Sequence, residues 1–357
     1  MTVNKNNKKS GALKSLSTSA TKRARDEKSE REAARAPKPT VSIIGGGRLG
    51  SALALALQAC GYFIEAIVAR RLSHARRVTR ILDSPSTRSL SAAQLDELPH
   101  SELTFITTPD DSIAATAARL AARVEKNEKS ARRKTALHMS GALSSAVLQP
   151  LGDVGYSIAS LHPLIAVSDP ARGAESLRNA FYCIEGERKA TATARKIVKE
   201  FGAQSFSIDA KDKTLYHAAA VTASGHLVAL FDTATRMLAH CGLSKARARE
   251  VLLPLVRSTV ENLSTREPSL ALTGSFARAD VEIIRQHLNA LRLLASPHQP
   301  HDALGVYILL GAHSLQLAQE NGTPIAALNE ISRALEQAKR GTKRSRKTKA
   351  ERRDKED

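Results

Sequence analysis

Tryptophan is absent from this sequence of 357 residues, and aromatic residues make up only 3% of it. Proteins that bind single-stranded nucleic acids stack the bases on aromatic side chains, which are scarce here. Cysteine is scarce as well: Cys60, Cys183 and Cys241 are far apart in the chain and odd in number. Such a set excludes a closed disulfide framework and lacks the CxxC spacing of a metal site. We therefore expect a reducing compartment and a cytoplasmic location.

Long apolar segments are also missing. The two most charge-poor segments, residues 215–231 and 303–319, are each 17 residues long and contain polar side chains. Both are too short and too polar for membrane spans, so we predict buried helices and no membrane anchor. The sequence has no HExxH, GxSxG or Walker lysine, and its 11 histidines are scattered. We therefore expect no metal site.

The excess of basic residues is concentrated at the two ends of the chain. Lys and Arg number 54 against 35 Asp and Glu, which gives a formal net charge of +19. Residues 1–39 carry +7 and residues 338–357 carry +6, leaving +6 for the body. Because both ends lack hydrophobic periodicity, we predict a disordered basic tail over residues 1–38 and a disordered charged tail over residues 338–357. Binding of nucleic acid would depend on these tails, and it is the weakest of our functional hypotheses.

Between the tails, short apolar runs alternate with helical patterns up to about residue 209, and helical patterns alone follow. This alternation is typical of parallel α/β sheets. We predict an α/β fold, with a Rossmann dinucleotide-binding domain over residues 39–165 followed by an all-α C-terminal domain. Residues 166–337 would form a strand–helix–strand extension and a helical substrate and dimerisation domain. The predicted strands are residues 40–44, 63–69, 103–107, 135–138, 157–161, 180–184 and 204–208.

A GxGxxG motif closes the first apolar run and opens a helix rich in Ala and Leu. In this context Gly45 permits a sharp turn, Gly47 leaves room for a pyrophosphate, and Gly50 lets the helix approach the strand. The N–H groups at the helix start, including those of Arg48 and Leu49, would then bind a diphosphate. The alternative is a glycine turn that serves packing alone.

The end of the second predicted strand indicates which dinucleotide is bound. A free ribose 2′-hydroxyl is usually held by an acidic residue about 20 residues past the fingerprint. Here Arg70, Arg71 and Ser73 follow the strand and no acidic residue is present. Guanidinium groups suit a 2′-phosphate, so we predict NADP(H) rather than NAD(H). The alternative is a solvated basic loop.

Three further cofactor contacts are expected from Thr107, Thr108 and Pro109, which follow the apolar run at residues 103–106. The strand end there should lie beside the first strand, where such sheets bind their ligands. Asp110 and Asp111 would also cap the next helix.

Six segments of the sequence, taken in order, carry a resemblance to a known family: residues 43–50, 108–113, 138–143, 160–164, 216–221 and 272–280. They resemble proteins that carry a DUF2520 domain, which are relatives of pyrroline-5-carboxylate reductase and prephenate dehydrogenase. The resemblance implies an NAD(P)-dependent oxidoreductase with a helical dimerising domain. The sequence departs from the family near Ser224, where members tend to have Asn, and at Ser275 and Ala279, where they tend to have Pro and Gly.

The candidate catalytic residues are polar side chains at predicted strand ends and at the start of the second domain. His162, fixed by the Pro that follows, resembles the catalytic histidine segment of prephenate dehydrogenases and is the first candidate for a proton donor or polariser. Ser140 could donate a hydrogen bond to the same substrate oxygen, and His217 is a second candidate acid. The alternatives are a strand-capping histidine, a turn serine and a buried structural histidine.

Arg278 is the candidate for binding a substrate carboxylate, with an ion pair to Asp280 as the alternative. The function predicted from these observations is the transfer of a hydride to or from a small, anionic carbonyl or imine substrate by NADP(H). A non-catalytic NADP(H) sensor or scaffold is the alternative. The two charge-poor segments need partners on several sides, so we also expect a homodimer formed through the C-terminal helices.

Overall fold

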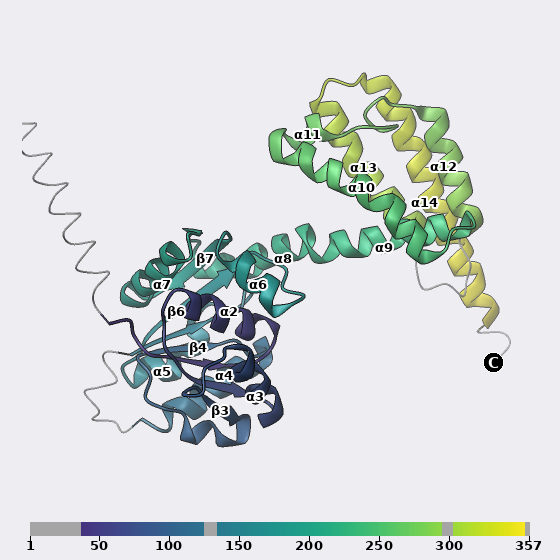
Figure 1. Cartoon of the computed structure of the whole chain (residues 1–357). Helices are drawn as coiled ribbons and strands as arrows, with labels where there is room; N and C mark the ends of the chain where they lie inside the picture. Colours follow the sequence, from purple (N-terminus) through teal and green to yellow (C-terminus); the bar gives the residue numbers. More distant parts are fainter. Residues whose placement is uncertain (1–36, 125–133, 295–302, 354–357) are drawn as a thin grey trace, which may run out of the picture. The chain divides into compact units, whose positions relative to one another are not determined.

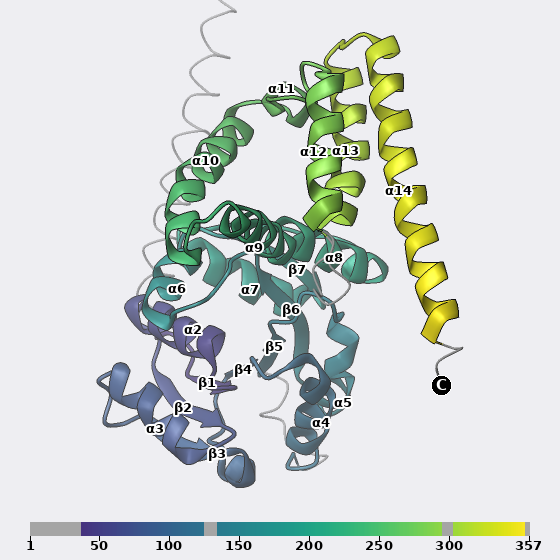
Figure 2. The ribbon, with the colours of Figure 1, turned by 90° about the vertical axis from the view of Figure 1, so that its right-hand side faces the viewer.

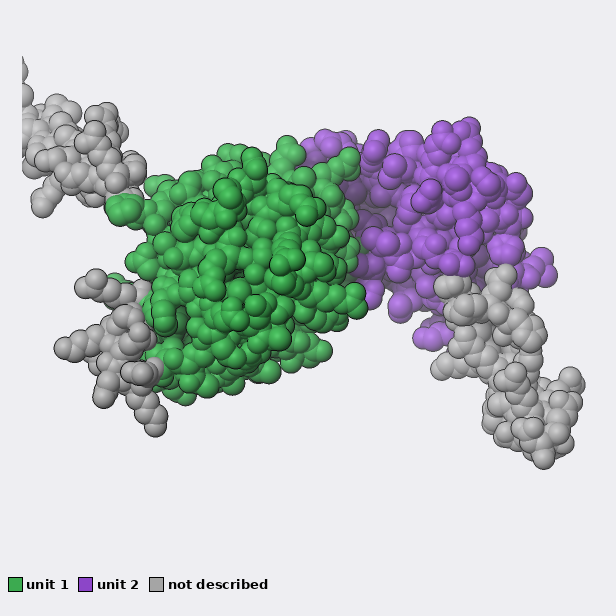
Figure 3. Space-filling view, turned by 60° about the horizontal axis from the view of Figure 1, so that its bottom comes forward, with its two compact units in different colours: residues 1–224 green, residues 225–357 purple. Residues whose placement is uncertain are grey.

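The computed structural model describes residues 37–124, 134–294 and 303–353, which divide into two compact units (Figures 1 and 3). Unit 1 ends at Ser224 and unit 2 begins at Gly225. The predicted disordered N-terminal tail lies outside the described residues, apart from its last two.

Unit 1 is built around one eight-stranded sheet with the order β3-β2-β1-β4-β5-β6-β7-β8. All neighbouring strands are parallel except β6 and β7. Its elements are β1 (Val41–Ile44), α2 (Arg48–Ala59), β2 (Ile64–Ala69), α3 (Leu72–Ile81), β3 (Arg88–Ser91), η1 (Ala92–Glu97), β4 (Leu103–Ile106), α4 (Asp110–Ala121), β5 (Thr135–His138), η3 (Ser145–Leu148), α5 (Gln149–Asp153), β6 (Ser157–Pro163), α6 (Pro170–Leu177), β7 (Phe181–Gly186), α7 (Arg188–Glu200), β8 (Gln204–Phe206), η4 (Ala210–Asp212) and α8 (Lys213–Ala223).

Helices cover both faces of this sheet because its strands are apolar on both sides. The side chains of Val41 and Ile43 pack with α2, α3, α6 and α7 on one face. Ile44, from the same strand, packs with η1, α4 and α5 on the other face. Figure 2 shows this layering around the central strands. The predicted α/β domain of the Rossmann type is thereby confirmed.

The two edges of the sheet compare differently with the prediction. The edge strand β3 was not predicted, since its sequence RSLS has one buried apolar residue, Leu90. At the other edge, the predicted strand–helix–strand extension forms β7, α7 and β8, whose strands continue the same sheet, and the compact unit extends to Ser224.

Unit 2 is entirely helical in its described residues. A core of buried apolar side chains joins α12, α13 and α14, which run side by side in Figure 2, and α9 packs along α10. The helices are α9 (Gly225–His240), α10 (Lys245–Thr265), α11 (Pro268–Ala271), α12 (Val281–Leu294), α13 (Ala303–Glu320) and α14 (Ile325–Arg353).

Two expectations about the C-terminal region need correction. The segment 215–231 is not one buried helix: it is divided at Ser224, and within α8 and α9 only Lys213 and Thr235 are buried. The tail from residue 338 was expected to be disordered, yet α14 continues through Arg353. Its Lys, Arg, Glu and Ala residues are good helix formers, which the absence of hydrophobic periodicity does not reveal.

Candidate functional site

The glycine-rich turn follows β1 and opens α2. Gly45 has a φ of 122°, which favours glycine, and the N–H groups of Gly45 and Gly46 donate to the carbonyl oxygen of Val68 at 2.8 and 3.0 Å. A Cβ on Gly50 would lie 1.9 Å from the carbonyl oxygen of Gly45, so only glycine fits at this position in the first turn of α2. A Cβ on Gly47 would meet no atom within 4 Å. Open space therefore lies over the start of α2.

Three helices begin at the carboxyl ends of β1, β2 and β4 without a side-chain cap. Their N-cap residues are Gly47 for α2, Arg71 for α3 and Pro109 for α4. The uncapped N–H groups at the starts of α2 and α3 attract anions. The expected capping of α4 by Asp110 or Asp111 is wrong, and these two carboxylates in its first turn disfavour an anion there. Thr108 adds a buried hydroxyl that has no hydrogen-bond partner among the described residues. These groups fit the phosphates and riboses of a dinucleotide, which parallel sheets bind where the strand order reverses, here between β1 and β4.

Thr107 and Leu49 have roles within the protein that the sequence did not indicate. The hydroxyl of Thr107 donates to the carbonyl oxygen of Gly45 at 2.7 Å, so its proton holds the glycine turn. The side chain of Leu49 packs against the core, which leaves its backbone N–H for a ligand, as for the neighbouring Arg48.

The end of β2 is basic, as predicted. Arg70 and Arg71 are both exposed and form no ion pair with any residue in the described ranges. Ser73 lies in the first turn of α3. Because no carboxylate neutralises these two guanidinium groups, they are available for a phosphate, in line with the predicted preference for NADP(H).

A second group of polar side chains surrounds Gly141, in the turn after β5. A Cβ on Gly141 would lie 2.5 Å from Cδ2 of His217 and 2.8 Å from both Cε1 and Nε2 of His162. The two imidazole rings have centroids 5.9 Å apart. Nδ1 of His162 is hydrogen-bonded to the hydroxyl of Tyr216 at 2.7 Å. The structure thus brings together the two predicted catalytic histidines, from β6 and α8.

We expected the hydroxyl of Ser140 to donate a hydrogen bond to a substrate oxygen, but its hydrogen-bond partners belong to the protein. Its hydroxyl donates to Oδ2 of Asp110 at 2.8 Å and accepts the N–H groups of Ala142 and Leu143 at 3.2 and 3.1 Å. The side chain therefore shapes the turn that carries Gly141. Through Asp110, it also ties this turn to the start of α4.

His138, at the end of β5, is hydrogen-bonded to the backbone of the same turn. It is fully buried, its Nδ1 accepts the N–H of Ser140 at 3.2 Å, and its Nε2 is hydrogen-bonded to the carbonyl of Ser144 at 3.1 Å. Burial, with a contribution from the nearby Lys213 ammonium, lowers the pKa of His138 to about 4. This histidine is neutral and structural.

Lys213 is the residue of this site that sequence reasoning missed. It is 1% exposed, and its Nζ donates to Oγ of Ser160 at 2.8 Å and to the carbonyl oxygen of Ser140 at 3.3 Å. It also lies 5.5 Å from the centre of the Tyr216 ring. Burial lowers the pKa of Lys213. The detectable signal was its spacing from Tyr216 and His217, at i+3 and i+4 on one helix face.

The site therefore contains a lysine whose hydrogen-bond partners are neutral, while the carboxylates of Glu185 and Asp110 act on it from beyond salt-bridge distance. No salt bridge to Lys213 is formed within the described residues, and its hydrogen-bond partners are neutral. Burial, Lys213 and His217 together lower the pKa of His162 to about 4. The imidazole of His162 is consequently neutral at physiological pH.

We expect the free energy of unfolding to fall as the pH drops from about 6.5 to about 4. The pKa values of His138 and His162 are about 4 in the folded protein, whereas the unfolded chain binds these protons below about pH 6.5. Each histidine then favours the unfolded chain by roughly 1.4 kcal/mol per pH unit. Urea unfolding between about pH 7 and about pH 4.5 measures this slope. His138→Gln should reduce it, and the exposed His313→Gln should not; equal slopes in all three would contradict the assignment.

Arg278 belongs to unit 2 and is paired with Asp280. Its Nη2 lies 2.7 Å from Oδ2 of Asp280, which is the alternative that the sequence analysis left open. Ala279 between them has a φ of 53°, a conformation that favours the glycine found in the family. Binding of a substrate carboxylate by Arg278 stays a prediction.

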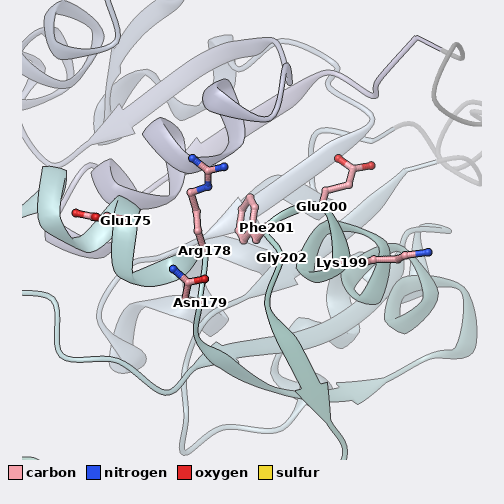
Figure 4. Close-up of a pocket in the computed structure, with 7 residues that line it drawn as sticks. All are labelled: Glu175, Arg178, Asn179, Lys199, Glu200, Phe201 and Gly202. Carbon is pink, nitrogen blue, oxygen red and sulfur yellow. The ribbon is translucent and has the colours of Figure 1, made fainter.

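A shallow hollow of about 440 Å³ lies between the ends of α6 and α7 (Figure 4). Its lining carries both charge signs and includes none of the predicted site residues: Glu175, Arg178, Asn179, Lys199, Glu200, Phe201 and Gly202. Elsewhere in the described residues, no group of three or more His, Cys, Asp or Glu gathers as metal ligands would. None of the helices searched there is long and apolar enough to cross a membrane.

The sheet order, the glycine turn and the helical second unit define a protein with a Rossmann-like α/β domain followed by a helical region. The Rossmann-like domain family matches residues 24–163, and the domain of unknown function DUF2520 matches residues 180–314. The chain therefore carries a Rossmann-like domain followed by a DUF2520 domain. No curated protein matches it.

Solved structures share the fold at low sequence identity. The predicted NADP oxidoreductase BF3122 from Bacteroides fragilis is 21% identical with a TM-score of 0.62, covering 78% of this chain and 99% of that one. Protein TM1727 from Thermotoga maritima is 20% identical with a TM-score of 0.58, covering 79% of this chain and 99% of that one. At these identities, the likeness establishes the fold.

Proposed function

We propose that this protein is an NADP(H)-dependent oxidoreductase that transfers a hydride to or from a small, anionic carbonyl or imine substrate. One observation carries the proposal: within unit 1, the segment from Thr107 to Asp110 is hydrogen-bonded both to the glycine turn and to the turn whose Gly141 lies next to the histidine pair. The hydroxyl of Thr107, directly after β4, donates to the carbonyl oxygen of Gly45 in the glycine turn. The carboxylate of Asp110, at the start of α4, accepts a hydrogen bond from the hydroxyl of Ser140. The name of the Bacteroides fragilis relative is consistent with this function.

NADPH would provide the hydride when bound. The residues around Gly141 would polarise the substrate, favour its charge and exchange a proton with it. The neutral imidazole of His162 can polarise a carbonyl or imine through a hydrogen bond. The positive charge of a protonated Lys213, which Glu185 and Asp110 offset only from beyond salt-bridge distance, favours a negatively charged substrate. His217 approaches the same space from α8 and is the second group able to exchange a proton.

Removal of the His162 imidazole tests the catalytic proposal. His162→Gln should lower kcat about 100-fold or more for any substrate that oxidises NADPH, because a positioned polar group contributes this much to such reactions. The affinity for NADPH, measured by calorimetry, should persist. His313→Gln is the matched control on an exposed helix face. Unchanged turnover in His162→Gln would overturn the assignment.

The sensor hypothesis predicts a different outcome. A protein that only reports the NADP(H) state binds the cofactor and never oxidises it. If no member of a panel of 2-oxo acids, cyclic imines and aldehydes oxidises NADPH above the rate without protein, the non-catalytic alternative is favoured.

Replacement of Arg70 and Arg71 by alanine should reverse the cofactor preference. Both guanidinium groups lack ion-pair partners in the described residues, so a 2′-phosphate would gain charge-assisted hydrogen bonds from them. Loss of both should weaken NADPH binding about 100-fold or more and leave NADH binding within about threefold, since each such bond contributes roughly 1.5–3 kcal/mol. Titration of both cofactors by calorimetry measures this. Equal affinities of the unaltered protein for NADH and NADPH would contradict the prediction.

Homodimer formation through unit 2 is proposed from its exposed apolar side chains. Val228 is 69% exposed and Leu255 is 62% exposed, and a run of such residues on one pair of helices is typical of an interface. Light scattering at micromolar concentration tests this, and a monomer there would contradict it. The exposed set on α9 and α10 is Leu227, Val228, Leu230, Val251, Leu253, Leu255, Val260 and Leu263.

A further inference from the structure

The hydroxyl of Tyr216 meets His162 on the side of the imidazole away from Gly141. It is hydrogen-bonded to Nδ1 at 2.7 Å, and the two rings pack edge to face, with centroids 5.6 Å apart and an interplanar angle of 86°. Nε2, the other ring nitrogen, lies next to Gly141 and has no hydrogen-bond partner among the described residues. One nitrogen is thus held by the protein, while the other is free for a ligand.

Both partners of this hydrogen bond are neutral. Whether Nε2 donates or accepts a hydrogen bond therefore depends on which nitrogen of the imidazole carries its single proton. Burial raises the pKa of the Tyr216 phenol, which therefore keeps its proton. The imidazole is neutral as well, because burial and Lys213 hold its pKa near 4. A neutral imidazole has one N–H, and the partner of the other nitrogen determines which nitrogen carries it.

The surroundings of the Tyr216 hydroxyl favour one of the two arrangements. In the described residues, this hydroxyl forms a hydrogen bond to one nitrogen or oxygen atom, Nδ1 of His162. The neighbouring Cys183 of β7, which is paired with His162 in the sheet register and is fully buried, offers only a thiol, a weak acceptor. If Nδ1 donated to the phenol, the phenolic proton would be left with that weak acceptor. The favourable arrangement is therefore phenol O–H to Nδ1.

We infer that Tyr216 is a positioning residue that holds His162 in the Nε2–H tautomer and so presents a hydrogen-bond donor over Gly141. The inference rests on the proposed function and deepens it. In this tautomer His162 donates to the oxygen or nitrogen of the substrate, whereas the Nδ1–H tautomer would turn a lone pair toward it. The substrate group that binds here is consequently an acceptor, such as a carbonyl oxygen or an imine nitrogen.

NMR of protein labelled with ¹⁵N-histidine tests the tautomer without requiring any activity. The His162 signals are identified by their loss in His162→Gln. In the full-length protein at neutral pH, we expect the Nδ1 shift of an unprotonated nitrogen and the Nε2 shift of a protonated one. An Nδ1–H signal for His162 in the unaltered protein would overturn the inference.

Tyr216→Phe keeps the aromatic ring and removes only the hydroxyl. We expect a mixture of the two tautomers and a fall of about tenfold in kcat, with the NADPH affinity unchanged. The matched control is Tyr182→Phe, which removes another buried hydroxyl, one that donates to the carbonyl of Leu177 at 2.8 Å. The control should change neither the tautomer nor kcat. If Tyr216→Phe retains a pure Nε2–H tautomer, the positioning role is refuted.

The two proposals fail separately. If no substrate oxidises NADPH in the presence of the unaltered protein, the proposed oxidoreductase is refuted, while the NMR spectra still decide the tautomer. If turnover is found but His162 carries its proton on Nδ1, the oxidoreductase stands and the role of Tyr216 is wrong.

Discussion

Gly47→Ala is expected to weaken NADPH binding in a protein that remains folded. The backbone at Gly47 has φ −76° and ψ −169°, an extended conformation that alanine adopts readily, and the added Cβ would meet no protein atom within 4 Å. The free energy of unfolding should therefore change by about 1 kcal/mol or less. The same Cβ would stand in the open space over the start of α2, where a pyrophosphate approaches the N–H groups. We expect the Kd for NADPH to rise about tenfold or more.

Gly50→Ala provides the contrast for this experiment. Its Cβ would overlap the carbonyl oxygen of Gly45 and lie 2.5 Å from Oγ1 of Thr107, so the turn itself must move. This variant should lose both stability and cofactor binding. Thermal unfolding and calorimetry on the two variants separate the effects, and normal NADPH affinity in Gly47→Ala would show that the turn serves packing alone.

Gly141→Ala should disable the histidine pair while leaving the glycine turn after β1 intact. A methyl group at this position would lie 2.5 Å from the ring of His217 and 2.8 Å from the ring of His162, so both rings must shift. His162 cannot turn freely, because Tyr216 holds its Nδ1. A displacement of about 1 Å in a catalytic group costs about 100-fold in rate, which is the loss that we expect in kcat/KM.

The matched control for this variant is Gly152→Ala in α5. The nearest atom to its added Cβ is the flexible amide end of Gln149 at 3.2 Å, and no catalytic candidate is nearby. NADPH affinity should stay unchanged in both variants. Turnover in Gly141→Ala equal to that in Gly152→Ala would contradict the placement of the active site.

Much of unit 1 was predictable because the signals are local. Buried parallel strands are rich in apolar residues, so β1, β2, β4 and β5 are visible as short, mainly hydrophobic runs. The edge strand β3 lacks this signal, since only one of its side chains reaches the core. Its pairing with β2 follows from the geometry of the sheet.

The candidate site was predictable in part. His162 and His217 were identified as separate candidates, but their meeting over Gly141 depends on how β6, α8 and the turn after β5 pack. Lys213 was not among the candidates from the sequence, and its burial against Ser160 comes from the sheet beneath it. Ser140 was assigned to substrate because sequence does not reveal that Asp110 accepts its proton.

By itself, the sequence determined most of the buried strands of unit 1, the glycine turn after the first strand and the basic pair after the second. These depend on backbone preferences and hydrophobic periodicity over a few neighbouring residues. Only the tertiary structure decided which polar groups are free and which are already bonded. Hydrogen bonds between residues tens of positions apart, such as the one from Tyr216 to His162, require the packed sheet and helices to bring their atoms within 3 Å.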